Sequence, residues 1–419
     1  MKKSYIIILV MLLVGLGSCR KDTTELLNPD APSQLLYDNY SGQFQTVWNG
    51  INNAYVFWSV DPMDWDKVYE ENLPVFQEFD SLEFVPMDQF EAAWEKVVGN
   101  LIDHHMAVRI RNLNPEPEAQ NNQITIRPGR IEAKTRNYYH PSTHEGGSFH
   151  NGILLNLLHM QEQGRVTSLD YETFDHPDMG EFTIVYAMIE GCAYLHMSNY
   201  IISEFVDVEP NEETPIGIAS RIYWEWRAAV AAPTTRGVIL DNRSNTGGYA
   251  KDLKYVISPF INEMVVIGDT RTKNGLDRFD YTPWAPVEIN PVENNPNDLS
   301  HKSYVVLADV NSISMGEIST DAVSTLPQGW FIGERTFGAT GPLVGMFPMY
   351  YAGTFGSSDG GHYVYTSSSM FRSLDGRIAE GIGMIPDEEV LFNAHADEFW
   401  AGTLDNQLEK AIQHIAQVQ

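Results

Sequence analysis

Apolar residues in the first quarter of the sequence recur at the spacing of amphipathic helices. Between residues 37 and 103 they fall three or four positions apart, which places their side chains on one face of a helix. The stripes consist of Phe44, Val47, Trp48, Ile51 and Tyr55, then Trp65, Val68 and Tyr69, and then Phe90, Trp94, Val97, Val98 and Leu101. We therefore predict an N-terminal helical domain over residues 37–115, whose aromatic side chains belong to its core.

From about residue 104 onward the pattern changes to short apolar runs separated by helical stretches. The runs at residues 237–240 and 304–307 are typical of buried strands, and residues 215–232 carry apolar positions along one helical face. Buried strands that alternate with helices indicate a layered α/β domain. We predict that residues 116–419 form this α/β core, although residues 116–180 show only turn signals.

The first nineteen residues have the features of an export signal. Two lysines precede an apolar run over residues 5–14, which is too short to cross a bilayer but suits a secretory signal. Residues 16–19, Leu-Gly-Ser-Cys, resemble the lipobox of bacterial lipoproteins, with Cys19 as the lipidated residue. We predict a lipoprotein signal peptide at residues 1–18, a flexible tether at residues 19–36, and lipid anchoring in the cell envelope, at the outer membrane or the periplasmic face. The alternative is an ordinary cleaved signal with an incidental cysteine.

Composition and net charge limit the kinds of molecule that this chain is expected to bind. Hydrophobic residues make up 43% of the 419 residues, which is typical of a globular protein. The chain has 56 acidic and 27 basic residues and a formal net charge of −29, so its surface repels polyanions and nucleic acid is not an expected partner. Cys192 is the one cysteine besides Cys19, so an internal disulfide is not expected in the mature chain.

Two junctions between a strand and a turn carry groups suited to acyl transfer. The first apolar run leads into residues 241–248, Asp-Asn-Arg-Ser-Asn-Thr-Gly-Gly, where paired glycines let backbone N–H groups approach a developing oxyanion. The second leads into residues 308–318, where Ser314 precedes a predicted helix and lies near the positive end of its dipole. Each motif alone is also compatible with an ordinary turn or helix cap.

Two later blocks complete a pattern that resembles the S41-type serine peptidases, the family of C-terminal processing (tail-specific) proteases and the tricorn core. They are residues 331–338, Phe-Ile-Gly-Glu-Arg-Thr-Phe-Gly, and residues 375–387, Asp-Gly-Arg-Ile-Ala-Glu-Gly-Ile-Gly-Met-Ile-Pro-Asp. The resemblance covers residues 180–392. It implies a crotonase/ClpP-like spiral α/β core and hydrolysis of a peptide or protein substrate through an acyl-enzyme, without cofactor or metal.

The same resemblance assigns roles to individual residues. Ser314 matches the family nucleophile, and the Met315 N–H with a glycine of the Gly247–Gly248 pair matches the oxyanion hole. In the processing-protease branch a lysine follows Thr-Phe-Gly and acts as the general base, but here that position is Ala339.

The tricorn-like branch uses a histidine and a glutamate instead of the lysine. His105 in Asp103-His104-His105 and Glu380 match these residues by position. An imidazole can take the serine proton while a carboxylate fixes its tautomer. We expect His104 to point elsewhere, because adjacent helical residues differ in direction by about 100°. Each of the two could also be structural, with His105 at a helix end and Glu380 in a solvated turn.

Two other interpretations remain open. The same fold is used by proteins that bind a ligand without cutting it, and Ala339 would then mark a lost catalytic site. A cluster of histidines could hold zinc, but its spacing is not that of a helical zinc-peptidase motif, so we expect a solvated or substrate-facing loop there. The cluster consists of His140, His144, Glu145 and His150. Residues 116–180 show no convincing PDZ module.

Overall fold

The computed structural model describes residues 37–145, 147–293, 298–347 and 349–418. The predicted signal peptide, the tether and Cys19 lie outside the described residues. Within the described ranges, no helix is both long and apolar enough to cross a membrane.

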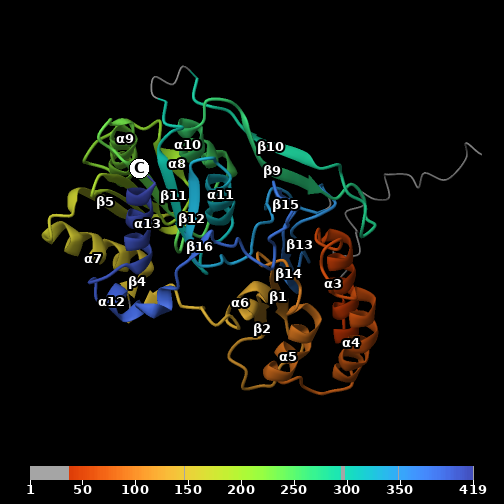
Figure 1. Cartoon of the computed structure of the whole chain (residues 1–419). Helices are drawn as coiled ribbons and strands as arrows, with labels where there is room; N and C mark the ends of the chain where they lie inside the picture. The colour runs from red at the N-terminus through yellow and green to blue at the C-terminus, as the bar shows by residue number, and fades with distance from the viewer. Residues whose placement is uncertain (1–36, 146, 294–297, 348, 419) are drawn as a thin grey trace, which may run out of the picture.

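Three helices form the N-terminal region, at the right of Figure 1: α3 (Tyr40–Ala54), α4 (Trp65–Phe79) and α5 (Met87–Val98). Two of them begin at side-chain caps, because Asn39 accepts the Gly42 N–H and Asp64 accepts the Lys67 N–H. The helices pack through their aromatic stripes, and the rings of Phe44 and Phe76 stack with centroids 4.7 Å apart. The predicted helical region with an aromatic core is thus confirmed.

A four-stranded antiparallel sheet in the order β13-β14-β1-β2 completes this region. Its strands come from distant parts of the chain: β1 (Ala107–Arg111), β2 (Gln123–Ile126), β13 (Phe355–Gly356) and β14 (His362–Tyr365). Phe355 and Val364 belong to the same hydrophobic core as the three helices, so strands β13 and β14 help to bury the apolar faces of the helices. The domain division at residues 115 and 116 stays a prediction, and the strands on either side of it, β1 and β2, pair with each other.

The largest sheet has seven strands in the order β16-β12-β11-β8-β7-β6-β5. The strands are β5 (Val166–His176), β6 (Gly180–Ile189), β7 (Cys192–Met197), β8 (Gly237–Asp241), β11 (Ser303–Ala308), β12 (Gly329–Gly333) and β16 (Glu388–Glu389). The strands from β7 to β16 pair in parallel, whereas β5, β6 and β7 are antiparallel. Strand β8 is buried along its whole length and reads as a continuous apolar run, as both-face burial requires.

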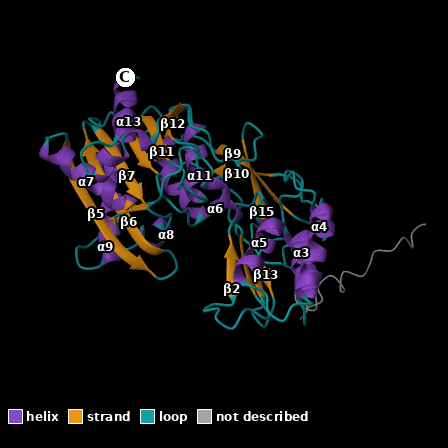
Figure 2. Cartoon of the chain, turned by 90° about the horizontal axis from the view of Figure 1, so that it is seen from below, coloured by secondary structure: helices purple, strands orange, loops and turns teal. Residues whose placement is uncertain are grey.

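Helices cover both faces of this sheet. Alternate residues of each strand point to opposite faces, so neighbouring residues pack against different helices. Val238 and Val306 pack in one core with α9 (Pro215–Ala231) and α11 (Met315–Ser324), whereas Ile239 and Val305 pack in another with α7 (Phe149–Glu162) and α13 (Asn406–Gln417). Figures 1 and 2 show this layered lobe beside the lobe that holds α3, α4 and α5. The mixed α/β core preceded by a helical region is the predicted fold class.

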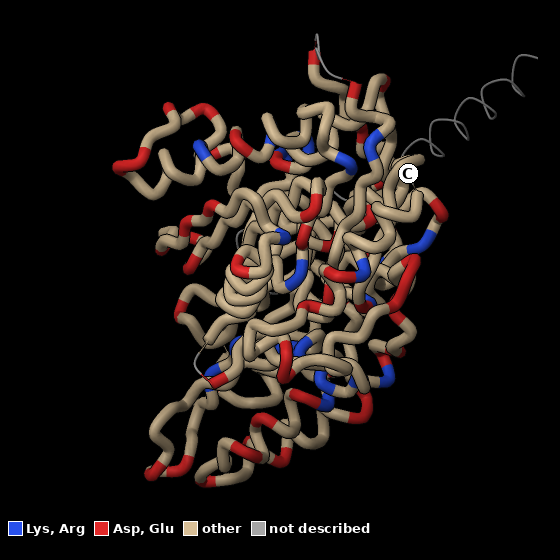
Figure 3. The backbone as a smooth tube through the Cα atoms, turned by 60° about the vertical axis from the view of Figure 1, so that its left-hand side comes forward, with Lys and Arg blue, Asp and Glu red and all other residues tan. Residues whose placement is uncertain are grey.

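A third sheet, in the order β10-β9-β15, connects the two lobes. It consists of β9 (Val265–Thr272), β10 (Ala285–Ile289) and β15 (Ser369–Ser373). The loop between β9 and β10 reaches the helical region, where Arg278 pairs with Asp66 at 2.5 Å and Lys273 Nζ donates to the Asn53 carbonyl at 2.6 Å. The shorter elements are α6 (Pro128–Ala133), β3 (Thr143–His144), β4 (Gly147–Ser148), α8 (Ile202–Phe205), α10 (Leu253–Ile257) and α12 (Ala396–Trp400). Acidic residues occur over the whole backbone, with fewer basic residues among them (Figure 3).

Candidate active site

Ser314 lies in the turn between β11 and α11, and its backbone is in an unusual conformation. Its φ of 58° and ψ of −117° are uncommon for a residue with a side chain and cost on the order of 1–3 kcal/mol. Its N–H donates to the Ala339 carbonyl at 3.0 Å and is 3.2 Å from Glu317 Oε2. Ser314 is half-buried, whereas Ser312 is fully buried and its hydroxyl donates to the Asn242 carbonyl at 2.8 Å. Of the two serines, Ser314 is therefore the one placed to react.

The glycine pair of residues 247 and 248 lies directly beside this serine. A Cβ on Gly247 would lie 2.6 Å from Ser314 Cβ and 3.0 Å from Ser314 Oγ, and the φ of Gly247 is 97°. A Cβ on Gly248 would lie 2.3 Å from the Tyr200 carbonyl oxygen, at a φ of 141°. Only glycine fits at either position without displacing its neighbours.

Backbone N–H groups near Ser314 differ in whether they are free to bind an oxyanion. The Gly247 N–H donates to Asn245 Oδ1 at 2.8 Å, so it is already occupied. The N–H groups of Gly248 and Met315 have no acceptor in the described part of the chain, and Met315 is the first residue of α11. The geometry thus favours Gly248 and Met315 over Gly247 as donors, and the oxyanion hole itself stays a prediction.

Glu317 holds the loop of residues 336–341 against the turn that carries Ser314. This role was not predicted from the sequence. Its carboxyl is fully buried and accepts the Thr336 hydroxyl at 2.5 Å and the N–H groups of Gly338 and Ala339 at 2.7 Å each. Burial raises the pKa of Glu317 to about 7, while these hydrogen bonds oppose the rise. The position three residues after the serine, as in a capping box, was the available signal.

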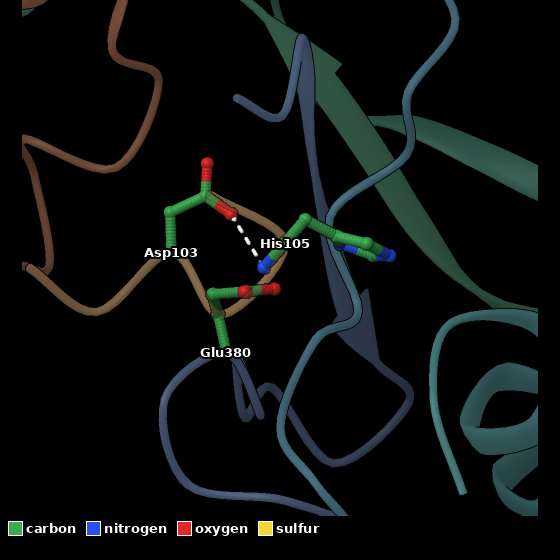
Figure 4. A group of neighbouring side chains, drawn as sticks. All are labelled: Asp103, His105 and Glu380. Carbon is green, nitrogen blue, oxygen red and sulfur yellow. Dashed lines mark hydrogen bonds between the residues drawn. The ribbon is translucent and has the colours of Figure 1, made fainter. Parts of the chain in front are cut away.

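His105 presents an imidazole with no partner. Both ring nitrogens are buried, and neither has a hydrogen-bond partner among the described residues. Burial lowers the pKa of His105 to about 4, so the ring is neutral at neutral pH and can accept a proton. The residue lies in a turn between α5 and β1 rather than at a helix end, and its N–H donates to Asp103 Oδ1 at 3.0 Å (Figure 4).

Its neighbour His104 lies in the same turn, and its ring contacts another segment of the candidate site. His104 is 7% exposed, and its ring Nδ1 lies 2.9 Å from the Phe337 carbonyl. The prediction that His104 and His105 point in different directions assumed that both lie on a helix. That helix, α5, ends earlier, at Val98. His104 therefore packs against the loop that contacts Ser314.

Two buried carboxylates flank His105. Asp103 accepts the Thr366 hydroxyl at 2.5 Å and the Ser367 N–H at 2.8 Å. Glu380 is only 2% exposed, so the alternative of a solvated turn residue is wrong. Burial raises the pKa of both carboxyls against the effect of their hydrogen bonds.

Glu380 is held by backbone groups on both of its oxygens. Oε1 accepts the His104 N–H at 2.8 Å, and Oε2 accepts the N–H groups of Thr340 and Gly341 at 2.7 Å each. These donors come from the turn that carries His105 and from the loop that contacts Ser314. Glu380 therefore connects the two predicted catalytic regions.

The structure brings His105, Glu380 and Asp103 together. One ring nitrogen of His105 and one oxygen of each carboxylate lie within 4.8 Å of one another. No hydrogen bond joins the ring to Glu380, and the ring extends away from both carboxylates (Figure 4). By distance the three could hold a metal ion, but every oxygen of both carboxylates already accepts an N–H or hydroxyl group.

The loop of residues 336–341 links these groups to the nucleophile. Ala339 is fully buried, and while its carbonyl accepts the Ser314 N–H, its own N–H donates to Glu317. The next two N–H groups along the loop donate to Glu380. One short stretch of backbone thus positions Ser314 relative to the turn that carries His105.

The comparison with family models identifies the central part of the chain. Residues 193–390 match the model of peptidase family S41. This region is of the S41 peptidase type. It includes Ser314, the glycine pair and Glu380, whereas His105 lies outside it and is near Glu380 in the structure. No curated protein matches the chain by sequence.

Solved structures share the fold of this chain. A candidate peptidase from Parabacteroides merdae ATCC 43184 has 17% sequence identity and a TM-score of 0.60, over 90% of this chain and 97% of that one. Mature CPAF complexed with lactacystin has 12% identity and a TM-score of 0.55, over 90% of this chain and 98% of that one. At these identities the comparison establishes the fold alone.

The histidines of residues 140–150 do not lie together at the candidate site. His140 is 2% exposed and lies between two buried carboxylates, so the solvated-loop interpretation is wrong for it. His144 lies on β3 with 47% of its side chain exposed. His150, on α7, is hydrogen-bonded to His196 at 2.9 Å. The three rings occupy three different environments.

Proposed function

We propose that this chain is a serine peptidase that hydrolyses peptide bonds through an acyl-enzyme. The observation that carries the proposal is the arrangement around Ser314. A half-buried serine in a strained turn lies beside a glycine pair and two N–H groups that have no acceptor among the described residues. The loop of residues 336–341 contacts this turn and also the turn that carries the neutral imidazole of His105. An S41-type region with this arrangement is suited to acyl transfer.

The proposed reaction uses His105 as the proton carrier. Its neutral imidazole takes the Ser314 hydroxyl proton while Oγ bonds to the carbonyl carbon, and the N–H groups of Gly248 and Met315 stabilise the oxyanion. The imidazolium then gives its proton to the departing amine as the C–N bond breaks, which leaves the acyl-enzyme. His105 then deprotonates a water molecule, whose oxygen bonds to the acyl carbon. The imidazolium returns the proton to Ser314 Oγ as the ester C–O bond breaks, which releases the peptide acid.

In this proposal Glu380 has two functions. When it is ionised, its carboxylate, with one oxygen within 4.8 Å of a ring nitrogen, stabilises the imidazolium. Its backbone hydrogen bonds hold the turn at His104 and the loop at Thr340 in fixed relation. The second function does not need a hydrogen bond to the His105 ring.

A protein that binds peptides or glycans without cutting them is the second candidate. The observation that favours it is that no hydrogen bond joins Ser314 to His105 in this structure. Catalytic hydrogen bonds are often long before substrate binds, so this observation alone does not decide against an enzyme.

Cleavage of an unfolded protein tests the proposal directly. The mature chain is incubated with denatured casein, and new peptide N-termini are identified by mass spectrometry. We expect Ser314→Ala to lower the rate by about 10³-fold or more. Ser324→Ala, a half-buried serine on the same helix, is the matched control and should cut normally. Cleavage that persists in Ser314→Ala contradicts the proposal, and binding of the substrate without cleavage by the wild type supports the second candidate.

A further inference from the structure

His140 lies at the centre of a buried charged cluster next to the proposed site. Its Nε2 is 3.2 Å from Glu334 Oε2 and 3.7 Å from Asp309 Oδ2, and both carboxyls are fully buried. The ring packs between Phe392 and Phe149, at centroid distances of 4.3 and 5.8 Å. Two carboxyls and one imidazole thus share a space lined by aromatic rings.

Asp309 connects this cluster to both turns of the proposed site. Its Oδ1 accepts the N–H groups of Ser244 and Asn311 at 2.9 Å each and the Ser312 hydroxyl at 3.1 Å. Ser244 belongs to the turn that leads to the glycine pair, which we call the glycine turn (residues 241–248). Residues 309–314 form the nucleophile turn. One carboxylate oxygen therefore shapes both turns.

The other oxygen of Asp309 depends on His140. Oδ2 has no hydrogen-bond partner among the described residues and faces the His140 ring. Burial raises the pKa of Asp309, and a positive charge on His140 opposes that rise by stabilising the carboxylate. Arg243 is the other cation near Asp309, but its guanidinium is bonded to Asp241 and Asp405.

The contacts of His140 favour its charged form. Burial alone would lower the pKa of His140, but the hydrogen bond to Glu334 and the charges of Asp309 and Glu334 raise it above 6.5. Asn311 Nδ2 also donates to the backbone carbonyl of His140 at 3.1 Å, a contact that does not depend on the charge of the ring.

We propose that His140, as an imidazolium between Asp309 and Glu334, is a positioning residue that holds the nucleophile turn and the glycine turn in their reactive arrangement. The effect on catalysis rests on the proposed peptidase function, whereas the effect on the two turns does not. Loss of the proton leaves two buried carboxylates facing an uncharged ring, so Asp309 moves away and both turns loosen. Because the folded-state pKa is raised, this support is complete below pH 6.5 and is lost as the pH rises through the folded-state pKa.

Hydrogen exchange of the mature chain measures the positioning without relying on activity. His140→Gln keeps hydrogen-bonding groups but cannot carry the charge. We expect exchange in peptides covering residues 241–248 and 309–315 to rise on the order of tenfold at pH 7, while the β5–β6 hairpin stays unchanged. His144→Gln, an exposed histidine of the same segment, is the matched control and should change neither peptide. Unchanged exchange in both turns, or an equal rise throughout the chain, overturns the proposal.

A second variant tests the charge balance. Glu334→Gln added to His140→Gln removes one buried carboxylate while retaining an oxygen that can accept the Phe392 N–H. We expect the double variant to recover much of the lost protection in both turns. If His140→Gln does not fold, the wild type supplies the test. After correction for intrinsic exchange, both turns should lose protection between pH 7 and 9, and constant protection there contradicts the proposal.

Labelling of Ser314 by a fluorophosphonate separates failure of this proposal from failure of the peptidase proposal. If the wild type labels and His140→Gln labels more slowly with a looser nucleophile turn, both proposals stand. Equal labelling of the two proteins with unchanged exchange overturns the positioning role only. A wild type that is not labelled argues against the peptidase, and the exchange data still decide the role of His140.

Discussion

The backbone carbonyl of Ala339 accepts the N–H of Ser314 at 3.0 Å. Position 339, which a lysine fills in the processing-protease branch that the sequence resembles, therefore acts through its backbone here. Its side chain is a buried methyl group that cannot take a proton. A base for Ser314 must come from another element, and the buried, unpartnered ring of His105 is the candidate.

The pH dependence of hydrolysis should reflect this base. His105 must be neutral to accept the serine proton, and burial lowers its pKa to about 4. We expect kcat/KM to rise with pH along an acid limb that lies below pH 6.5, and a lysine base would place the rise higher. The profile is measured with a peptide substrate from pH 4 to 9. A rise centred above pH 7 argues against His105.

Glu380→Gln should be more harmful than a simple loss of charge. Both oxygens of Glu380 accept backbone N–H groups, so an amide would turn its NH₂ toward one set of donors. We expect a loss of about 1–3 kcal/mol in the free energy of unfolding, together with a lower kcat. Urea denaturation and steady-state kinetics measure the two effects. A variant as stable as the wild type shows that these hydrogen bonds are dispensable.

The pair of His150 and His196 should make the protein sensitive to acid. His196 Nδ1 donates to the Asp241 carbonyl at 2.9 Å, so its Nε2 can accept from His150 Nδ1 only while the His196 ring is neutral. Burial lowers the pKa of His150 to about 3 and also lowers that of His196. In the unfolded chain these two histidines bind protons near pH 6.5. The free energy of unfolding should therefore fall as the pH drops below that value.

His150→Gln tests this acid sensitivity. It removes one titrating group, so the free energy of unfolding should change less steeply between pH 6.5 and 4, by up to about 1.4 kcal/mol per pH unit. His159→Gln, on the same helix with a side chain that is 36% exposed, is the control. Equal slopes for His150→Gln and the wild type contradict the interpretation.

The lipobox hypothesis predicts where the protein is found. Cys19→Ala should move the protein from the membrane fraction to the soluble fraction, because the acylated thiol is the proposed anchor. Ser18→Ala keeps a small residue at the cleavage site and should stay in the membrane fraction. Fractionation and metabolic labelling with a fatty acid measure both. Tight membrane association of Cys19→Ala points to another anchor.

The sequence was most informative where local patterns determine local structure. The apolar run at residues 237–240 becomes β8, and the aromatic stripes become α3, α4 and α5, because burial and helical periodicity act over a few neighbouring residues. The place of Ser314 between a strand and a helix could be predicted for the same reason, whereas its role as nucleophile rests on the family resemblance and stays a prediction.

Contacts between distant segments could not be predicted in this way. The bonds of Glu380 to His104 and Thr340 join residues far apart in sequence, so Glu380 could be matched by position but not seen to be buried. His140 was misread for the same reason, because its neighbours Pro141 and Gly147 suggest a loop while Glu334 and Asp309 come from the ends of two strands.

The most direct test of the central claim is the site and rate of fluorophosphonate labelling of the mature chain, determined by mass spectrometry. We predict that the wild type is modified at Ser314. His105→Gln, with an unchanged melting temperature, should react more slowly by a factor of about 10³ or more. Ser312→Ala should keep the label at Ser314 if it folds. Modification of a different residue, or His105→Gln labelling at the wild-type rate, would contradict the assignment of Ser314 and His105.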